Sequence, residues 1–273
     1  MIHRRTLRGV PHRHVWACAL LISLFLIPFS SRGSEIDLLS RGNEGTVNGA
    51  LFQQGSTGAG SGAFIQFYRL QGKGSQRGYN SSGRREFDTK NGAIDLQLSQ
   101  MTVTTIHGTE YLSFGLDLNE HSSSPAKYIS LDTVEIYVSE TGGNTGYSHP
   151  GSVGGTGGLG TLIYDMDAGE DSTVFLDYSL ESGSGWSDMW LHVPADRLTG
   201  RDTDDYVYVY SEFGGYAGSY NGIGDWASEA AGFEEWSWNS GANTALVPEP
   251  GAFSLLVLAL GAAAGIRRPR KSA

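Results

Sequence analysis

The middle of this chain alternates between apolar and polar side chains, and this period of two limits the possible folds more than any other feature. Successive side chains of a β-strand point to opposite faces, so the alternation indicates half-buried strands. The clearest example is Tyr206 to Tyr210, with three tyrosines on one face and two valines on the other. The other runs of this kind are Ala63 to Tyr68, Tyr111 to Leu118, Leu131 to Val138, Thr173 to Leu180 and Met189 to Val193.

Turn-forming residues separate these runs, and no amphipathic helix of about a dozen residues is apparent between them. Glycine supplies 39 of the 273 residues, which is well above its usual share of roughly 7%. Asn91-Gly92 predicts a two-residue hairpin turn, because both residue types tolerate positive φ. Further turn segments are Gly72 to Gly74, Glu181 to Gly185 and Gly214-Gly215. Roughly ten short strands joined by turns predict an all-β fold, a single β-sandwich or jelly-roll-like domain.

The first 33 residues have the pattern of a secretory signal peptide. Arginines without any acid precede an apolar run from Val15 to Phe29. This run is shorter than the roughly 20 residues that span a bilayer, and Ser31 and Gly33 place small residues where a signal peptidase cleaves. We therefore predict a signal helix that is removed after Gly33, before an exported domain over residues 34–246. A permanent N-terminal anchor is the alternative.

Residues 247–273 carry three features in a fixed order: a proline-containing motif, an apolar helix expected over 251–266, and a basic tail over 267–271. Sixteen helical residues extend about 24 Å, less than the roughly 30 Å hydrocarbon core, so the helix is short for a permanent anchor. The positive-inside rule keeps the basic tail cytoplasmic and exports everything before it. The residues of the motif and of the basic tail are Val247, Pro248, Glu249, Pro250, Arg267, Arg268 and Arg270.

This order of features resembles the PEP-CTERM protein-sorting signal. The resemblance implies recognition by an exosortase, a membrane transpeptidase of bacteria that build extracellular polysaccharide, and removal of the tail. It also implies that the C-terminal helix anchors the chain in the inner membrane only transiently. Interior segments such as Leu176 to Leu180 and Gly232 to Trp236 look like parts of uncharacterised secreted proteins with the same tail, a group with no known activity. A short permanent anchor is the alternative.

Charge is distributed unevenly along the chain. The whole chain has 19 basic and 29 acidic residues and a net charge of −10. Nine of the basic residues and none of the acids lie outside residues 34–250, so that segment has a net charge of −19. Such acidity argues against nucleic acid as a partner, because phosphate binding needs clustered Lys and Arg. The single cysteine, Cys18, lies in the signal peptide, which excludes a disulfide framework and a thiolate zinc site.

A glycine-rich loop is expected over residues 142–160, which contain nine glycines. Within it, Gly155 to Gly160 matches the letters of the dinucleotide fingerprint G-x-G-x-x-G. That fingerprint needs a preceding strand and a following helix, whereas a Pro-Gly loop precedes this segment and a strand is expected over Thr161 to Met166. We therefore expect no nucleotide, and predict a long flexible loop between two strands.

Clustered acids suggest calcium as the one candidate cofactor, since calcium takes six to eight oxygen ligands and acidic loops supply them. The EF-hand spacing is absent because Gly169 stands at the fifth position of the cluster and not the sixth. Ordinary acidic surface turns are the alternative. The candidate ligands are Asp165, Asp167, Glu170 and Asp171, and a second cluster comprises Asp202, Asp204 and Asp205.

No catalytic residue is predicted. The exported domain has no nucleophile elbow, and its histidines show no metal-ligand spacing. Glu234 and Glu235 are adjacent, so on a strand they point to opposite faces and cannot act as a catalytic pair. These histidines are His107, His121, His149 and His192. We therefore do not expect an enzyme.

All five tryptophans of the exported domain lie within residues 186–238. Exposed aromatic rings stack on sugars, which makes Trp186, Trp190 and Trp226 a candidate glycan platform; burial in the core is the alternative reading. Trp236 and Trp238 are expected to share one side of a strand.

Together these features favour an exported protein of the cell envelope, outer surface or extracellular matrix. We expect it to be non-enzymatic and structural or adhesive in a biofilm, with an exosortase and the membrane as partners during sorting and exopolysaccharide as a further partner. The alternative is a carbohydrate-binding or glycan-hydrolysing secreted β-sandwich.

Overall fold

The computed structural model describes residues 33–55, 65–84, 86–183 and 185–238. The predicted signal helix, the C-terminal apolar helix and the sorting motif lie outside these residues. None of the helical segments within the described ranges has the length and hydrophobicity of a membrane-spanning helix. The helical elements of this part are short 3-10 turns at Leu98–Gln100, Tyr178–Leu180 and Ala195–Leu198.

Sheet A has eight strands arranged around the long strand β9 (Tyr128–Ser139). One edge of β9 pairs with β12 (Thr173–Asp177) and, further along, with β11 (Gly160–Asp165); its other edge pairs with β14 (Tyr206–Phe213). These pairings are antiparallel, whereas β1 lies parallel to β12. The outer strands are β1 (Glu35–Leu38), β5 (Gln76–Tyr79), β6 (Leu96–Gln97) and β10 (Thr156–Gly157).

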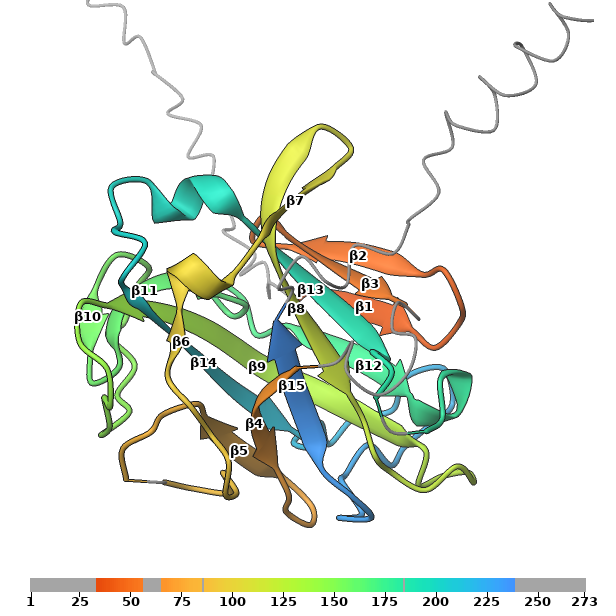
Figure 1. The fold of residues 1–273 in the computed structure, drawn as a ribbon. Helices are drawn as coiled ribbons and strands as arrows, with labels where there is room; N and C mark the ends of the chain where they lie inside the picture. Colours follow the sequence, from red (N-terminus) through yellow and green to blue (C-terminus); the bar gives the residue numbers. More distant parts are fainter. Residues whose placement is uncertain (1–32, 56–64, 85, 184, 239–273) are drawn as a thin grey trace, which may run out of the picture. The chain divides into compact units, whose positions relative to one another are not determined.

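Sheet B has seven strands, all in antiparallel pairs, in the order β2, β3, β13, β8, β15, β4, with β7 also paired to β8 (Figure 1). Their bounds are β2 (Glu44–Val47), β3 (Ala50–Gln54), β4 (Gln66–Leu70), β7 (Val103–Ile106), β8 (Thr109–Asp117), β13 (Met189–Pro194) and β15 (Glu234–Trp238). These two sheets confirm the predicted all-β, sandwich-like fold class.

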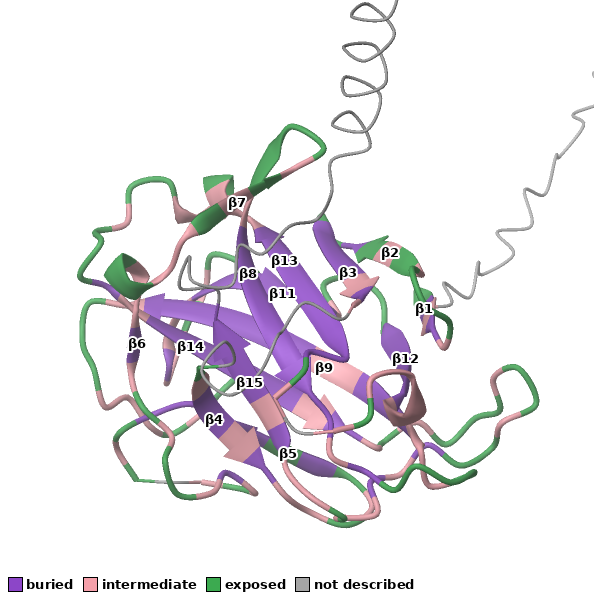
Figure 2. Ribbon diagram, turned by 45° about the vertical axis from the view of Figure 1, so that its right-hand side comes forward, coloured by how far each residue is buried: buried purple, intermediate pink, exposed green. Residues whose placement is uncertain are grey.

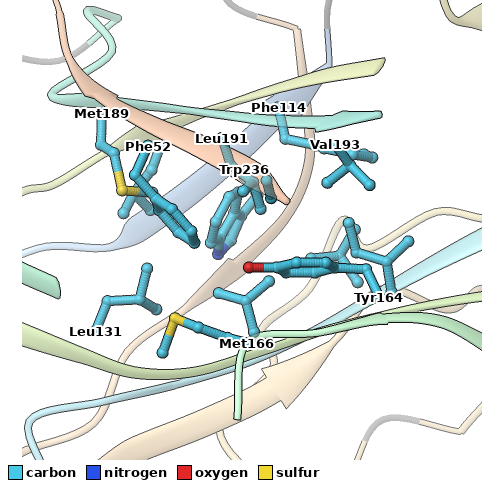
Figure 3. Close-up of a cluster of buried hydrophobic side chains, with 14 of the residues drawn as sticks. Phe52, Phe114, Leu131, Tyr164, Met166, Met189, Leu191, Val193 and Trp236 are labelled. Atoms are coloured by element: carbon cyan, nitrogen blue, oxygen red, sulfur yellow. The ribbon is translucent and has the colours of Figure 1, made fainter. Parts of the chain in front are cut away.

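The core lies between the sheets, and the buried residues run along the strands of both (Figure 2). In Figure 3, sheet A contributes Leu131 and Tyr164, which face Phe52, Leu191 and Trp236 of sheet B. The predicted alternation in β14 is confirmed, because Val207 and Val209 belong to this core while Tyr208 and Tyr210 belong to a separate cluster on the other face. Trp236 and Trp238 also both lie in the core, as expected from their spacing.

Two local predictions were wrong. The run Thr173 to Leu180 is a strand only to Asp177, whose carboxylate accepts the Ser179 N–H at 2.8 Å and so begins a 3-10 turn. Asn91-Gly92 forms a turn but no hairpin, because β6, the next strand, pairs with β14. Two-residue hairpin turns in which both residues have positive φ lie instead at Asn48-Gly49 and His107-Gly108, as a type I′ turn requires.

Candidate functional site

The face of sheet A that points away from the core carries a cluster of tyrosines. Tyr137 of β9 and Tyr208 and Tyr210 of β14 are buried there beside Leu159 and Leu162. Tyr147 of the glycine-rich loop stacks on Tyr210, with ring centroids 3.8 Å apart. The loop therefore covers this face and shields the tyrosines from solvent.

The glycine-rich loop is packed against β11 and against itself, which differs from the long flexible loop predicted from its composition. The Gly154 N–H donates to the Leu162 carbonyl at 2.7 Å, and the Leu162 N–H donates to Gly155 at 2.9 Å. A Cβ on Gly158 would lie 1.8 Å from the Gly146 carbonyl oxygen. Glycine is thus needed here for close backbone approach.

Three side chains from different segments meet beside the tyrosines: Glu135 of β9, His149 of the loop and Asp165 at the end of β11. One ligand atom from each lies within 4.8 Å of the others. His149 Nε2 is 3.3 Å from Asp165 Oδ2 and 3.8 Å from Glu135 Oε1. Burial raises the pKa of Glu135, while hydroxyl donors from Tyr137 and Tyr147 oppose that rise.

The tautomer of His149 decides what this group can do. Its Nδ1 accepts the Gly151 N–H at 3.1 Å, so a neutral ring carries its proton on Nε2, the nitrogen that faces both carboxylates. A histidine that binds a metal through Nε2 instead carries its proton on Nδ1 and donates it to an oxygen. In this arrangement Glu135, His149 and Asp165 form a polar contact, which we call the latch, that holds the loop on sheet A.

A second concentration of acids lies at one end of sheet B, which we call the acidic end: Asp117, Glu120, Asp188, Glu234 and Glu235. Burial raises the pKa of Asp117 to about 7, and the Gly185 N–H, which donates to its Oδ2 at 2.6 Å, opposes the rise. Asp188 is 3% exposed, and burial raises its pKa well above the ordinary value. Carboxyl groups in such surroundings hold protons or bind cations.

Glu120 and Glu234 form a buried pair within this end of the sheet. Glu234 Oε2 accepts from Gln76 at 2.5 Å, and Glu120 Oε1 accepts from Ser228 at 2.6 Å. Burial and the neighbouring Glu120 raise the pKa of Glu234. The pair therefore favours holding one proton between its two carboxyl groups.

A serine and a histidine also meet on the outward face of sheet B. Ser113 Oγ lies 2.7 Å from His192 Nδ1, and His192 Nε2 lies 3.0 Å from Gln53 Oε1. Ser113 is 1% exposed, and burial lowers the pKa of His192 to about 4. The imidazole is neutral at pH 7 and both its nitrogens are hydrogen-bonded, which suits a structural contact between β8, β13 and β3.

The four predicted calcium ligands do not converge. Asp165 belongs to the latch, and Asp167 accepts the Ser172 N–H at 2.9 Å within its own turn. Burial raises the pKa of Asp167 to about 6, while Glu170 and Asp171 are exposed. Among the described acids and histidines, Glu135, His149 and Asp165 are the one group of three whose ligand atoms approach this closely. The second cluster, Asp202 to Asp205, caps a turn in which Asp205 accepts the Asp202 N–H at 3.3 Å.

The three tryptophans of the candidate glycan platform lie in different environments. Trp226 is 1% exposed and packs on Phe175 at 4.5 Å between centroids, so it cannot reach a sugar. Trp190 on β13 is 7% exposed, whereas Trp186 in the preceding loop is 38% exposed. Of the three predicted platform residues, Trp186 alone is exposed.

The predicted sorting residues, from Val247 to Pro250 and from Arg267 to Arg270, lie outside the described residues. Sequence reasoning missed His149, Asp117 and Asp188 as members of side-chain groups. Glu135 carried one usable signal, an acid between the apolar residues Val134 and Ile136 of β9. The others gave none, because their partners lie far away in the sequence.

Comparison with known proteins identifies no family. No family model matches the chain, and no curated protein matches it. A solved structure from a study of family 12 glycoside hydrolases aligns with 11% identity over 73% of this chain and 96% of that chain, at a TM-score of 0.21. A likeness at that score supports no conclusion about fold or activity.

Proposed function

We propose that this chain is an exported, non-enzymatic protein of the bacterial cell envelope or extracellular matrix that an exosortase sorts. One observation carries the proposal: the sandwich ends where the terminal signals begin. The first strand starts at Glu35, two residues after the expected cleavage at Gly33, and the last strand ends at Trp238, before Val247. Removal of both ends would leave every described strand intact.

The proposed role in the matrix is structural or adhesive, with exopolysaccharide as the partner. A net charge of −19 over residues 34–250 keeps such a domain soluble outside the cell and attracts cations. During sorting, the C-terminal apolar segment would hold the chain in the inner membrane until the exosortase removes it.

Mass spectrometry of the protein isolated from its native host tests the sorting step. We expect no peptide beyond about Pro250 in the mature protein, and retention of the tail when the exosortase gene is deleted. A P248A/P250A double variant should also keep its tail, whereas an exposed sandwich substitution such as Asp171→Asn should not. Recovery of mature wild-type protein with residues 267–273 attached would contradict the proposal.

A second candidate function, carbohydrate binding, is favoured by the exposed ring of Trp186. Alanine at this position should lower affinity for purified exopolysaccharide at least about tenfold, as loss of one stacked aromatic ring does. Phe87→Ala, at a 45% exposed ring elsewhere on the surface, is the matched control. Equal binding by both variants would remove this candidate, and release of reducing sugar would distinguish hydrolysis from binding.

A further inference from the structure

Asp188 is a buried carboxylate with one oxygen that has no partner. Its Oδ2 accepts the Leu118 N–H at 2.7 Å, while its Oδ1 makes no hydrogen bond. The Ser187 hydroxyl beside it in the sequence and the Trp190 ring N–H are also buried and without partners. Natural proteins contain few such groups, and each one needs an explanation, of which a bound ion or water is one.

The charged groups around Asp188 are acids. Asp117, Asp177 and Glu181 all act on its carboxylate with the same sign of charge. The nearby cations are engaged elsewhere: Lys127 Nζ lies 2.6 Å from Asp177, and Arg41 pairs with Glu181. Within the described ranges, no Lys, Arg or His forms an ion pair with Asp188 or Asp117.

Two hydrogen bonds between side chain and backbone connect the segments that carry Asp117 and Asp188. Asp188 binds the N–H of Leu118, the residue after Asp117, and Asp117 binds the N–H of Gly185, three residues before Asp188. The end of β8 and the loop before β13 therefore hold two carboxylates close together. Burying uncompensated charge costs several kcal/mol per ion, so a charge-balancing species is needed whenever both groups are ionised.

We propose that Asp188 Oδ1 and the Asp117 carboxylate bind a divalent calcium ion at the acidic end of sheet B. The available donors are carboxylate oxygens, which suit a hard cation. Calcium accepts irregular oxygen sets completed by water, whereas magnesium demands a near-octahedral set and zinc prefers nitrogen and sulfur. The site differs from the acidic loop of Asp165 to Asp171, where turn N–H groups occupy Asp165 and Asp167.

Thermal unfolding of the full chain in CaCl2 and in EGTA tests the site. At a calcium concentration tenfold above Kd, we expect the Tm of the wild type to rise by about 3 °C or more. Asp188→Asn should abolish the shift, because the amide removes one ligand charge at nearly constant shape. Asp171→Asn, at an exposed acid of the loop first suggested by sequence, should keep the full shift.

Two further readouts apply even if Asp188→Asn fails to fold. Terbium added to the wild type should luminesce on tryptophan excitation, and calcium should displace it, because Trp190 lies two residues from Asp188. Calcium binding should also release protons at pH 7 and tighten between pH 6 and pH 8, since the ion replaces protons on carboxyl groups of raised pKa.

Three results would overturn the proposal. The first is a wild-type Tm that is the same in CaCl2 and EGTA, which means that protons or water alone fill the site. The second is a full calcium shift in Asp188→Asn. The third is stabilisation by ZnCl2 but not by CaCl2, with loss in His149→Ala, which would place the metal at the latch instead.

Discussion

Glu120 and Glu234 are the residues at which burial and charge conflict most directly. Their exposed fractions are 5% and 0%, and two ionised carboxylates in contact repel each other strongly when buried. A raised folded-state pKa means that the folded chain holds a proton that the unfolded chain has released. The free energy of unfolding is therefore highest below the ordinary glutamate pKa and falls as the pH rises through the folded value.

Glu234→Gln should remove this loss of stability at high pH. The glutamine amide can donate to Glu120 at every pH while its carbonyl still accepts from Gln76, so no proton has to be shared. We expect the variant to be more stable than the wild type by about 1–3 kcal/mol at pH 8 and nearly equal to it at pH 4.5, by urea denaturation. The buffer should contain no calcium, so that ion binding at Asp117 and Asp188 does not contribute to the measured stability.

Glu229→Gln is the matched control, because Glu229 is a partly exposed neighbour that pairs with Lys73 at 3.2 Å. Its effect should be within about 0.5 kcal/mol at both pH values, as for a surface ion pair. Equal destabilisation of Glu234→Gln at pH 4.5 and pH 8 would show that Glu120 and Glu234 share no proton.

Adjacency in the sequence correctly predicted that Glu234 and Glu235 have different surroundings. Glu234 binds Gln76, whereas Glu235 lies 3.7 Å from Arg69. The partner Glu120 was not predictable, because it comes from a different strand end that only the folded sheet brings near. The same holds for Asp117 with Asp188, so local spacing predicts the face of a residue and not its long-range partner.

The glycine-rich loop shows the same limit at the scale of an element. Its composition predicted a connection between two strands, and it does lie between β9 and β11, but its residues Thr156–Gly157 form the short strand β10. Composition did not predict that the loop packs, because the need for each glycine depends on which backbone atom lies opposite. The strands of strong alternation, such as β8 and β14, were predicted well. The short strands β1, β2 and β5 were missed because four residues carry little periodic signal.

Gly158→Ala tests the packing of this loop. The added Cβ would meet the Gly146 carbonyl oxygen at 1.8 Å, so the backbone of one loop segment must move away from the other. We expect a loss of at least about 2 kcal/mol in the free energy of unfolding, in line with steric strain on a packed backbone, measured by urea denaturation.

Gly224→Ala is the control for that substitution, since nothing lies within 4 Å of a Cβ built there and its φ is not in the positive region. Its effect should stay within about 0.5 kcal/mol. If the two alanine variants were equally stable, the loop would be the loose linker that its composition suggests. Tyrosine fluorescence should also report solvent entry at Tyr147 and Tyr210 in Gly158→Ala alone.

At the scale of the whole molecule, the path of the chain between the two sheets determines how cooperatively the fold unfolds. The strands β12, β13, β14 and β15 alternate between sheet A and sheet B, and so do β1 and β2 at the other end of the chain. Alternation along single strands predicted two-faced sheets, but it does not say which strand joins which sheet. That assignment depends on long-range pairing, which one sequence does not reveal.

Because the chain crosses between the two sheets several times, neither complete sheet can form from a continuous stretch of chain. Sheet A needs β1 from one end and β14 from the other, and sheet B needs β2 and β15. One buried cluster contains core residues of both sheets. We therefore expect one cooperative unfolding transition, in which far-UV circular dichroism of the strands and near-UV signals of the buried Trp236 and Tyr164 change at the same urea concentration.

Val209→Ala tests this coupling, because it opens space in the core on the sheet A side. It should lower both midpoints together, with a loss in the free energy of unfolding typical of a lost pair of methyl groups, about 1–3 kcal/mol. Midpoints that separate in this variant would mean that the sheets unfold independently, and the alternating path between them would then not couple their stabilities.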